Sequence, residues 1–320
     1  MTSRREHRHA RRPGRLRDRL GRTALAALVG AAVVLPVSAA ASPNVPAPAG
    51  AVFAEHASAA ERFAANRANM AEAIRMAEAA GRAGRAQRLR ALDAGGSARL
   101  LAFDGRGTGR VVEVFGDLAG ADRIAVLVPG SDTTLDTYER FRAGAVALQE
   151  RLRTEHPASA VVAWLGYDTP GTVSPAVLTA GRADDAARGL EALITQLGTV
   201  ARPGARLTLL CHSYGSVVCA RTVTGPAVTD VALYGSPGTG AENAGELPTG
   251  ARVWAGRGAT DWIAGVPHVR LGGVGFGTDP VAPEFGARIF PAGGGGHSDY
   301  LKPGTVSLAS LARIVLGGAP

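Results

Sequence analysis

The chain from Ser97 onward is patterned as short, nearly continuous apolar runs. These runs are IAVLVPG, AVVAWLGY, RLTLLCHS, DVALYGS, RVWAGRG and RIFPAGG, and most of them end in Gly, Ser or Pro. Continuous rather than alternating hydrophobicity is typical of strands that are covered on both faces. Helical patterns over residues 135–153 and 180–197 are long enough to connect parallel strands. The pattern therefore predicts an α/β fold, with a mostly parallel central sheet and helices on both faces.

The residues before these runs predict a hairpin and, further upstream, a helical segment. SARLLAFD and GRVVEVFGDL, joined by Gly-rich residues, are typical of two antiparallel strands. Apolar residues recur upstream at helical spacing: Phe63, Met70, Ile74 and Ala77. Residues 52–92 are therefore predicted as helix, and the Gly95-Gly96 pair ends this region. We assign residues 52–96 to an N-terminal helical segment and residues 97–320 to the α/β domain.

The first 41 residues have the order of a secretory signal peptide. Nine Arg in residues 1–22 are followed by an apolar stretch and by small residues, and a Pro/Ala linker occupies residues 42–51. The apolar stretch is shorter than the roughly 20 residues that a membrane span needs. We expect export to the cell envelope or the medium, with no stable membrane span in the mature protein. The Sec and twin-arginine routes both stay open.

Charge and cysteine content narrow the class of protein. The formal net charge is +8, and residues 1–22 alone account for +7 of it, from nine Arg against one Glu and one Asp. Because the remainder is nearly neutral, the charge does not indicate a nucleic-acid partner. Two cysteines, Cys211 and Cys219, are too few for a disulfide scaffold. We expect two small buried packing residues, with a disulfide as the open alternative.

The stretch LTLLCHSYGSVVCA contains the candidate nucleophile. Its apolar start predicts a buried strand, residues 216–222 predict a helix, and Ser213 lies on the turn between them. Such a turn exposes the serine Oγ, and Gly215 removes a Cβ that would clash. The pattern is Cys-x-Ser-x-Gly, so Cys211 must fit where Gly is usual. His212 is expected to point away from the nucleophile. The alternative is that Ser213 only caps the helix.

A serine nucleophile needs a histidine base and a carboxylate that orients the histidine. His297 follows the last predicted strand in a glycine-rich loop and is the candidate base, the alternative being an exposed loop histidine. Asp261 follows RVWAGRG, and its place between Ser213 and His297 fits the order nucleophile, acid, histidine. Asp279 is the rival acid, or else an Asp-Pro turn residue. A structural pair of His268 with Asp279 is the less favoured arrangement.

Acyl transfer also needs two N–H donors that stabilise the oxyanion. The candidates are the backbone of Tyr214, which follows the nucleophile, and that of Ser131 in the loop VPGSDTTLD. Because Asp132 would repel an oxyanion, we expect Asp132 or Thr133 to cap the helix that begins near residue 135. This chemistry implies no metal and no cofactor.

Several ordered motifs resemble a known protein family. They are AVVAWLGYDTP (160–170), LCHSYGS (210–216), GTDPVAPEFGARIF (277–290) and GHSDYL (296–301), with NRANM (66–70) in the helices that precede them. They are similar to an α/β-hydrolase family found mainly in actinobacterial proteins and catalogued as a domain of unknown function. The resemblance covers roughly residues 52–316. It implies the α/β-hydrolase fold with Ser213, Asp261 and His297 in the triad roles, and it supplies no substrate. Members usually carry Gly where Cys211 stands here.

These patterns predict an exported serine hydrolase, esterase-like, that cleaves a carboxylic ester or related acyl bond through an acyl-enzyme on Ser213. Two alternatives stay open: a non-catalytic cell-envelope binding module on the same fold, and an acyltransferase with the same triad. The expected partner is a small-molecule acyl substrate, and the oligomeric state stays unknown. The connections 236–252 and 263–286 are rich in Gly and Pro, so we expect no dedicated lid and a preference for short acyl chains.

Overall fold

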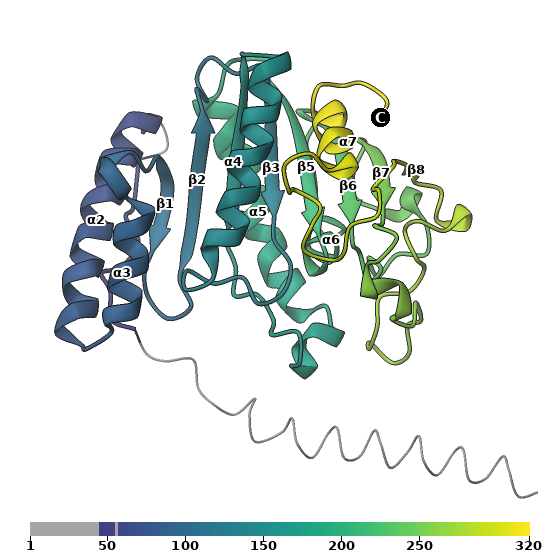
Figure 1. Cartoon of the computed structure of the whole chain (residues 1–320), viewed down its shortest axis with the longest axis horizontal. Helices are drawn as coiled ribbons and strands as arrows, with labels where there is room; N and C mark the ends of the chain where they lie inside the picture. Colours follow the sequence, from purple (N-terminus) through teal and green to yellow (C-terminus); the bar gives the residue numbers. More distant parts are fainter. Residues whose placement is uncertain (1–44, 55–56) are drawn as a thin grey trace, which may run out of the picture. The chain divides into compact units, whose positions relative to one another are not determined.

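The computed structural model describes residues 45–54 and 57–320, so the predicted signal peptide (1–41) lies outside the described residues. Figure 1 shows a sheet with helices on both faces. Its strands are β1 (Leu100–Asp104), β2 (Arg110–Gly116), β3 (Arg123–Val128), β4 (Ser159–Leu165), β5 (Arg206–His212), β6 (Val228–Tyr234), β7 (Arg252–Gly256) and β8 (Arg288–Ile289). The α-helices of the described part are α2 (Ala59–Ala79), α3 (Ala83–Leu92), α4 (Tyr138–Glu155), α5 (Gly181–Val200), α6 (Tyr214–Cys219) and α7 (Val306–Val315).

The eight strands form one sheet in the order β1-β2-β4-β3-β5-β6-β7-β8. β1 pairs antiparallel with β2, and β2 pairs antiparallel with β4. All the other neighbours are parallel. The predicted hairpin and the predicted mostly parallel sheet are both confirmed. Because β3, β5, β6 and β7 run in one direction, their C-terminal ends meet at the same edge of the sheet, where sites of open α/β folds lie.

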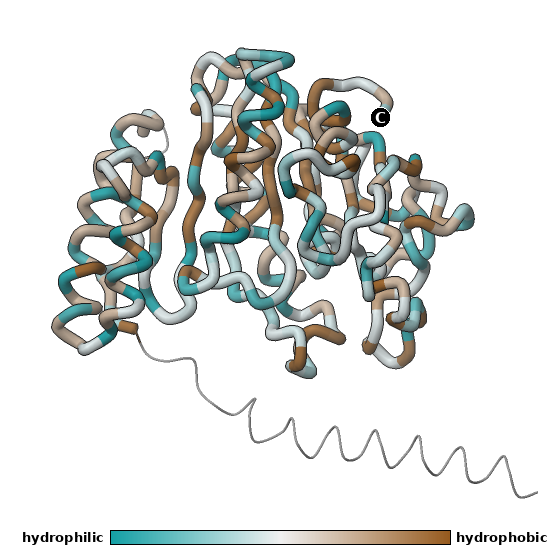
Figure 2. The backbone as a smooth tube through the Cα atoms, viewed as in Figure 1, coloured by the Kyte–Doolittle hydropathy of each residue, from teal (hydrophilic) through white to brown (hydrophobic). Residues whose placement is uncertain are grey.

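The core has two apolar layers, one on each face of the sheet. Leu148 of α4 and Leu311 of α7 belong to one layer. Leu190 of α5 and Val217 of α6 belong to the other. The strands between these layers are buried on both sides, and all seven residues of β4 are buried. Figure 2 shows the result as brown segments that run through the central strands. The continuous apolar runs in the sequence are therefore explained by strands that are covered on both faces of the sheet.

The N-terminal helical segment differs from the prediction, because residues 52–92 form two helices and not one. The first helix begins only at Ala59, where Ser58 and Glu61 form a capping box. It ends at Ala79. Gly81 follows with a φ of 68°, and the N–H groups of Gly81 and Arg82 donate to the carbonyls of Glu78 and Ala77. This C-terminal cap reverses the chain, which then continues as α3.

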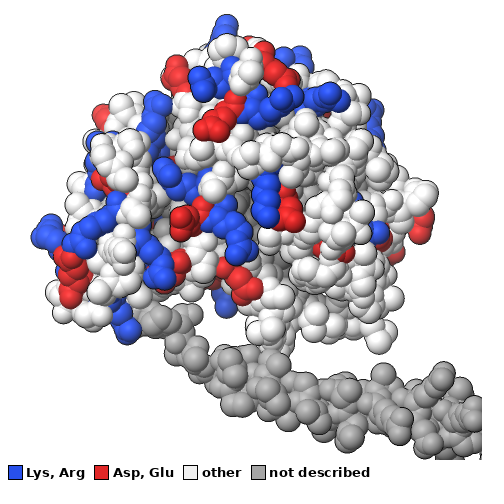
Figure 3. Space-filling view, in the orientation of Figure 1, with Lys and Arg blue, Asp and Glu red and all other residues white. Residues whose placement is uncertain are grey.

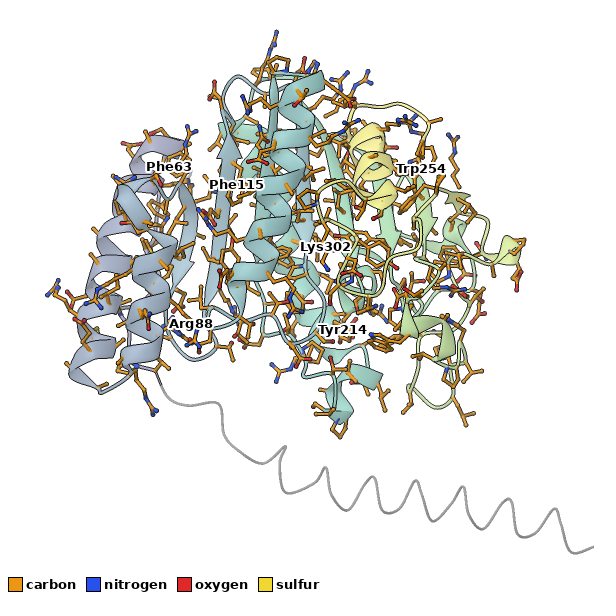
Figure 4. All side chains as sticks on the ribbon, viewed as in Figure 1. Phe63, Arg88, Phe115, Tyr214, Trp254 and Lys302 are labelled. Carbon is orange, nitrogen blue, oxygen red and sulfur yellow. A yellow bond between two sulfur atoms is a disulfide. The ribbon has the colours of Figure 1, made fainter. Side chains whose placement is uncertain are left out.

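The N-terminal helices lie at the β1 edge of the sheet. Figure 1 shows α2 and α3 beside β1, several strands away from the end of β5. In Figure 4, Phe63 of α2 and Tyr214 of α6 are correspondingly far apart. The helices therefore do not cover the end of β5. Within the described residues, no helix is both long and apolar enough to cross a bilayer.

Candidate active site

Ser213 lies on the turn between β5 and α6 in a conformation that non-glycine residues rarely adopt. Its φ is 52° and its ψ is −125°. Its N–H donates to the carbonyl of Tyr234 at 3.0 Å, which extends the pairing of β5 with β6 by one residue. The hydroxyl of Ser216 donates to the carbonyl of Ser213 at 2.6 Å and so fixes the other side of the turn. The predicted strand–serine–helix arrangement is confirmed, although the helix begins at Tyr214 rather than at residue 216.

Two glycines allow the backbone to close around this turn. A Cβ on Gly215 would lie 2.6 Å from the carbonyl oxygen of Val128, so only glycine lets α6 approach the end of β3. A Cβ on Gly130 would lie 2.6 Å from the Cβ of Ser213. The loop after β3 therefore lies directly against the serine, which is where a second oxyanion donor is expected.

The structure brings Ser213, His297 and Asp261 together in one chain of hydrogen bonds. The distance between Ser213 Oγ and His297 Nε2 is 2.9 Å. The distance between His297 Nδ1 and Asp261 Oδ1 is 2.8 Å. The serine comes from the end of β5, the aspartate from the loop after β7, and the histidine from the loop after β8. The parallel strands thus carry three residues from distant parts of the sequence to one edge of the sheet.

Asp261 is buried and accepts hydrogen bonds from three partners. Besides His297, these are the hydroxyl of Tyr300 at 2.5 Å and the N–H of Ile263 at 2.9 Å. Burial raises the pKa of Asp261, but the hydrogen bonds from His297, Tyr300 and Ile263 outweigh it and hold the pKa below its ordinary value. The carboxylate is therefore ionised at neutral pH. An ionised carboxylate only accepts hydrogen bonds, so Nδ1 of His297 is the donor.

Tyr300 was not predicted as a site residue. Its hydroxyl also accepts a hydrogen bond from the N–H of Gly258 at 3.0 Å, so it connects Asp261 to the loop after β7. Burial, followed by the hydrogen bond to Asp261, raises the pKa of Tyr300, which keeps the phenol protonated as a donor. Its position three residues after His297 in GHSDYL was the available signal. A tyrosine three residues after a candidate histidine is not a recognised catalytic motif, so the sequence alone did not indicate its hydrogen bond to Asp261.

His212 does not point away from the site as expected. Its ring lies 4.7 Å from the His297 ring, and its Nε2 donates to the backbone carbonyl of His297 at 2.8 Å. Burial, followed by the proximity of His297, lowers the pKa of His212 to about 3. The expectation failed because alternation of side chains along a strand ends where the strand turns sharply at the nucleophile. A neutral His212 therefore holds the loop that carries His297.

The backbone N–H groups of Tyr214 and Ser131 are available for an anion. Tyr214 is the first residue of α6, so its N–H has no acceptor within the helix. In the described part of the chain, no hydrogen-bond acceptor is found for the N–H of Ser131. Asp132 does not cap α4, contrary to expectation, because its carboxylate accepts from the N–H and the hydroxyl of Thr172. Thr133 does not cap the helix either, because Thr137 is the N-cap residue and the helix begins at Tyr138.

The rival acid Asp279 lies in a separate cluster. Its carboxylate accepts a hydrogen bond from Arg257, and His268 Nε2 lies 3.4 Å from the same oxygen. The structural pair of Asp279 and His268, which the sequence disfavoured, is therefore present as a contact. Asp261 and not Asp279 is bonded to His297.

The two cysteines form a disulfide, so the packing interpretation was wrong. Cys211 at the end of β5 is bonded to Cys219 at the end of α6. Both side chains are buried. The sequence alone could not decide this, because the distance between the two residues depends on how α6 folds back over β5.

Potential metal ligands do not gather at the site. Across residues 45–54 and 57–320, no group of three or more His, Cys, Asp or Glu side chains is arranged to hold a metal ion.

A parallel sheet with a strained serine on a strand–helix turn and a hydrogen-bonded histidine and aspartate defines the class of α/β-hydrolases. The chain belongs to the alpha/beta hydrolase family, whose sequence pattern matches residues 104–271. This range includes Ser213 and Asp261 but not His297.

Comparison with individual proteins gives relatives whose own functions are open. Uncharacterized protein Rv2079 of Mycobacterium tuberculosis is 31% identical over 262 residues, which cover 68% of this chain and 38% of that protein. Uncharacterized protein Rv0963c of the same species is 35% identical over 143 residues, which cover 41% of this chain and 53% of that protein. The chain thus spans less than two-fifths of the length of Rv2079. Among solved structures, esterase LipW from Mycobacterium marinum is similar with a TM-score of 0.43 and 15% identity, covering 77% of this chain and 88% of that chain.

Proposed function

We propose that the protein is an exported serine hydrolase that cleaves a carboxylic ester or related acyl bond through a Ser213 acyl-enzyme. The observation that carries this proposal is the bond chain from Asp261 through His297 to Ser213, at 2.8 Å and 2.9 Å. The strained backbone of Ser213 adds support, since such a conformation costs about 1–3 kcal/mol and clusters at functional sites. A passive binding module on the same fold would gain nothing from that cost.

The hydrogen-bond directions specify the route of the proton. Because His297 Nδ1 donates to Asp261, Nε2 carries the lone pair that accepts the proton of the Ser213 hydroxyl. As Oγ bonds to the carbonyl carbon of the ester, this proton passes to Nε2, and the imidazolium then gives it to the departing alkoxide. A water molecule attacks the acyl-enzyme in the second half of the reaction. His297 takes the proton of that water and returns it to Oγ.

The negative charge of the tetrahedral intermediate needs stabilisation at the carbonyl oxygen. The N–H groups of Tyr214 and Ser131 are proposed for this role, since both are free and the loop of Ser131 lies against Ser213 through Gly130. The Asp132 carboxylate is hydrogen-bonded to the N–H and the hydroxyl of Thr172, so its charge is partly compensated there.

Export stays part of the proposal. Its support is the order of charged, apolar and small residues in the first 41 positions. The disulfide between Cys211 and Cys219 agrees with it, because such bonds persist mainly in oxidising compartments outside the cytosol.

A fluorophosphonate probe tests the proposed nucleophile. We expect covalent labelling of the folded protein at Ser213, and loss of both labelling and ester turnover in Ser213→Ala. The matched control is Ser298→Ala, which removes an exposed hydroxyl next to His297 and should retain labelling. A wild-type protein that is neither labelled nor active on simple esters would support the binding-module alternative. Faster transfer of the acyl group to an added alcohol than to water would support the acyltransferase.

A further inference from the structure

The loops around the candidate site carry most of the exposed large apolar side chains of the described residues. Six of the ten lie in two connections, the one between β4 and α5 and the one between β7 and β8. We call these six residues the apolar rim. They are Val173, Leu178, Trp262, Val269, Leu271 and Val274. Their exposed fractions range from 49% to 83%. Single exposed apolar side chains are common, but several gathered on neighbouring loops are typical of a ligand or partner site.

The apolar rim is continuous with the catalytic residues. The Trp262 ring lies 4.5 Å from the ring of His297. The hydroxyl of Tyr214 donates to the carbonyl of Thr179 at 2.7 Å, next to Leu178. The N–H of Gly275 donates to the carbonyl of Leu178 at 2.9 Å, which joins the two loops to each other. The rim therefore begins at the histidine and at the residue after the nucleophile.

The rim is nearly free of charge. Residues 172–180 contain no charged side chain, and residues 262–278 contain only Arg270 apart from His268. The Arg270 guanidinium donates to the backbone carbonyl of Gly240 at 2.7 Å. Figure 2 shows brown tips on both loops at the lower edge of the view, and the same part of Figure 3 is largely white. Two carboxylates from other segments reach these loops at their ends, since Asp132 accepts a hydrogen bond from the N–H of Thr172 and Glu242 accepts one from the hydroxyl of Thr278. The six rim side chains themselves offer only apolar contact.

We propose that the Ser213 site takes esters of long, unbranched aliphatic acids, and that the acyl chain lies on the apolar rim. This proposal rests on the proposed function and replaces the expectation of short chains. That expectation assumed that an open site without a lid buries little of the substrate. The connections do lack a helical lid, since in the described structure 236–252 and 263–286 hold only short 3-10 turns. The side chains of the rim nevertheless supply the apolar surface that a lid would otherwise provide.

The experiment compares p-nitrophenyl acetate, butyrate, hexanoate, octanoate and decanoate, each below its aggregation concentration, and measures decanoate above that concentration as well. Full burial of a methylene is worth about fourfold in binding, so burial on one side predicts a rise in kcat/KM of about twofold per methylene. Val173→Ser/Leu271→Ser changes one exposed residue of each loop. We expect it to lower kcat/KM for decanoate about tenfold and to change acetate less than about twofold. Val223→Ser changes a valine that is 64% exposed, against 71% for Val173, and that lies at the opposite edge of the sheet, so it should alter neither rate.

The other outcomes overturn the proposal in distinguishable ways. If acetate is hydrolysed in a Ser213-dependent manner and kcat/KM is flat or falls with chain length, the long-chain proposal is wrong and the proposed function holds. If the rate rises only above the aggregation concentration, the rim binds a lipid surface and not a single chain. If Ser213→Ala hydrolyses acetate as well as the wild type, the proposed function is wrong, and this proposal is wrong with it.

Discussion

Protonation of His212 is expected to destabilise the fold in a pH range where most carboxylates remain ionised. The ring is enclosed by His297, Tyr234 and Tyr300, with Asp261 close by. Its Nε2 donates to the carbonyl of His297, an interaction that needs no positive charge. A proton on the other nitrogen would place a buried charge beside a second histidine. His212→Gln keeps an N–H donor at this place and removes the titrating group.

The magnitude follows from the shift of the pKa. Burial lowers the pKa of His212 from 6.5 to about 3, so between these values the unfolded chain binds a proton that the folded protein excludes. Stability therefore falls as the pH falls through this window. Each pH unit well below 6.5 costs up to about 1.4 kcal/mol, so the loss between pH 7 and pH 4.5 is on the order of 2 to 3 kcal/mol.

Urea unfolding from pH 7 to pH 4.5 measures this loss. We expect the free energy of unfolding of the wild type to fall further than that of His212→Gln, by on the order of 2 to 3 kcal/mol. The difference between the two proteins cancels the contributions of the other titrating groups. The pKa of Asp261 is lowered, so its contribution to the stability of the fold is lost only below the ordinary pKa of an aspartate. Burial raises the pKa of Glu113, so its effect is to increase stability as the pH falls, and this effect is the same in both proteins. Parallel pH profiles for the two proteins would refute the argument.

Asp261→Asn is expected to lower kcat for an ester about a thousandfold or more, because His297 loses the carboxylate that fixes its tautomer. Asp279→Asn should change kcat little. Steady-state kinetics of both variants on one ester measure the two effects, and a larger loss of kcat in Asp279→Asn than in Asp261→Asn would make Asp279 the acid. Mass spectrometry of the exported protein should find its N-terminus within residues 39–42, whereas a full-length chain in the membrane fraction would contradict cleavage. Cys211→Ala/Cys219→Ala should lower the free energy of unfolding by about 2.5 kcal/mol, as measured in urea without reductant, and unchanged stability would show that the bridge contributes nothing.

The sequence predicted the sheet and the meeting of the candidate residues because both depend on simple periodicity. Strands buried on two faces are apolar throughout, and parallel strands bring their C-terminal ends to one edge. Ser213 directly follows such a strand, and Asp261 lies in the loop after another. His297 follows β8, which has only two residues, both exposed, so its proximity was predicted from strand order and not from a buried strand. Their catalytic roles stay predictions.

The features that sequence did not predict depend on how loops and helix ends fold. The helical pattern of residues 52–92 continues across the turn at Gly81, so periodicity alone shows one helix where a cap makes two. Asp132 and Thr137 are both good capping residues, and only the path of the loop decides between them. The apolar rim likewise cannot be predicted from sequence, since nothing in the Gly-rich loop around Leu271 indicates that this loop will bond to the loop of Leu178 through Gly275.

Position 211 shows why a departure from the usual Gly-x-Ser-x-Gly pattern is tolerated. The tight backbone approach of α6 occurs at Gly215, whose Cβ would meet the carbonyl of Val128. Cys211 points into the core instead, where its sulfur bonds to Cys219. The bridge ties the strand before Ser213 to the helix after it, and it closes a loop of only a few residues around the strained serine. A side chain that fills the position of a glycine thus becomes a covalent restraint on the turn.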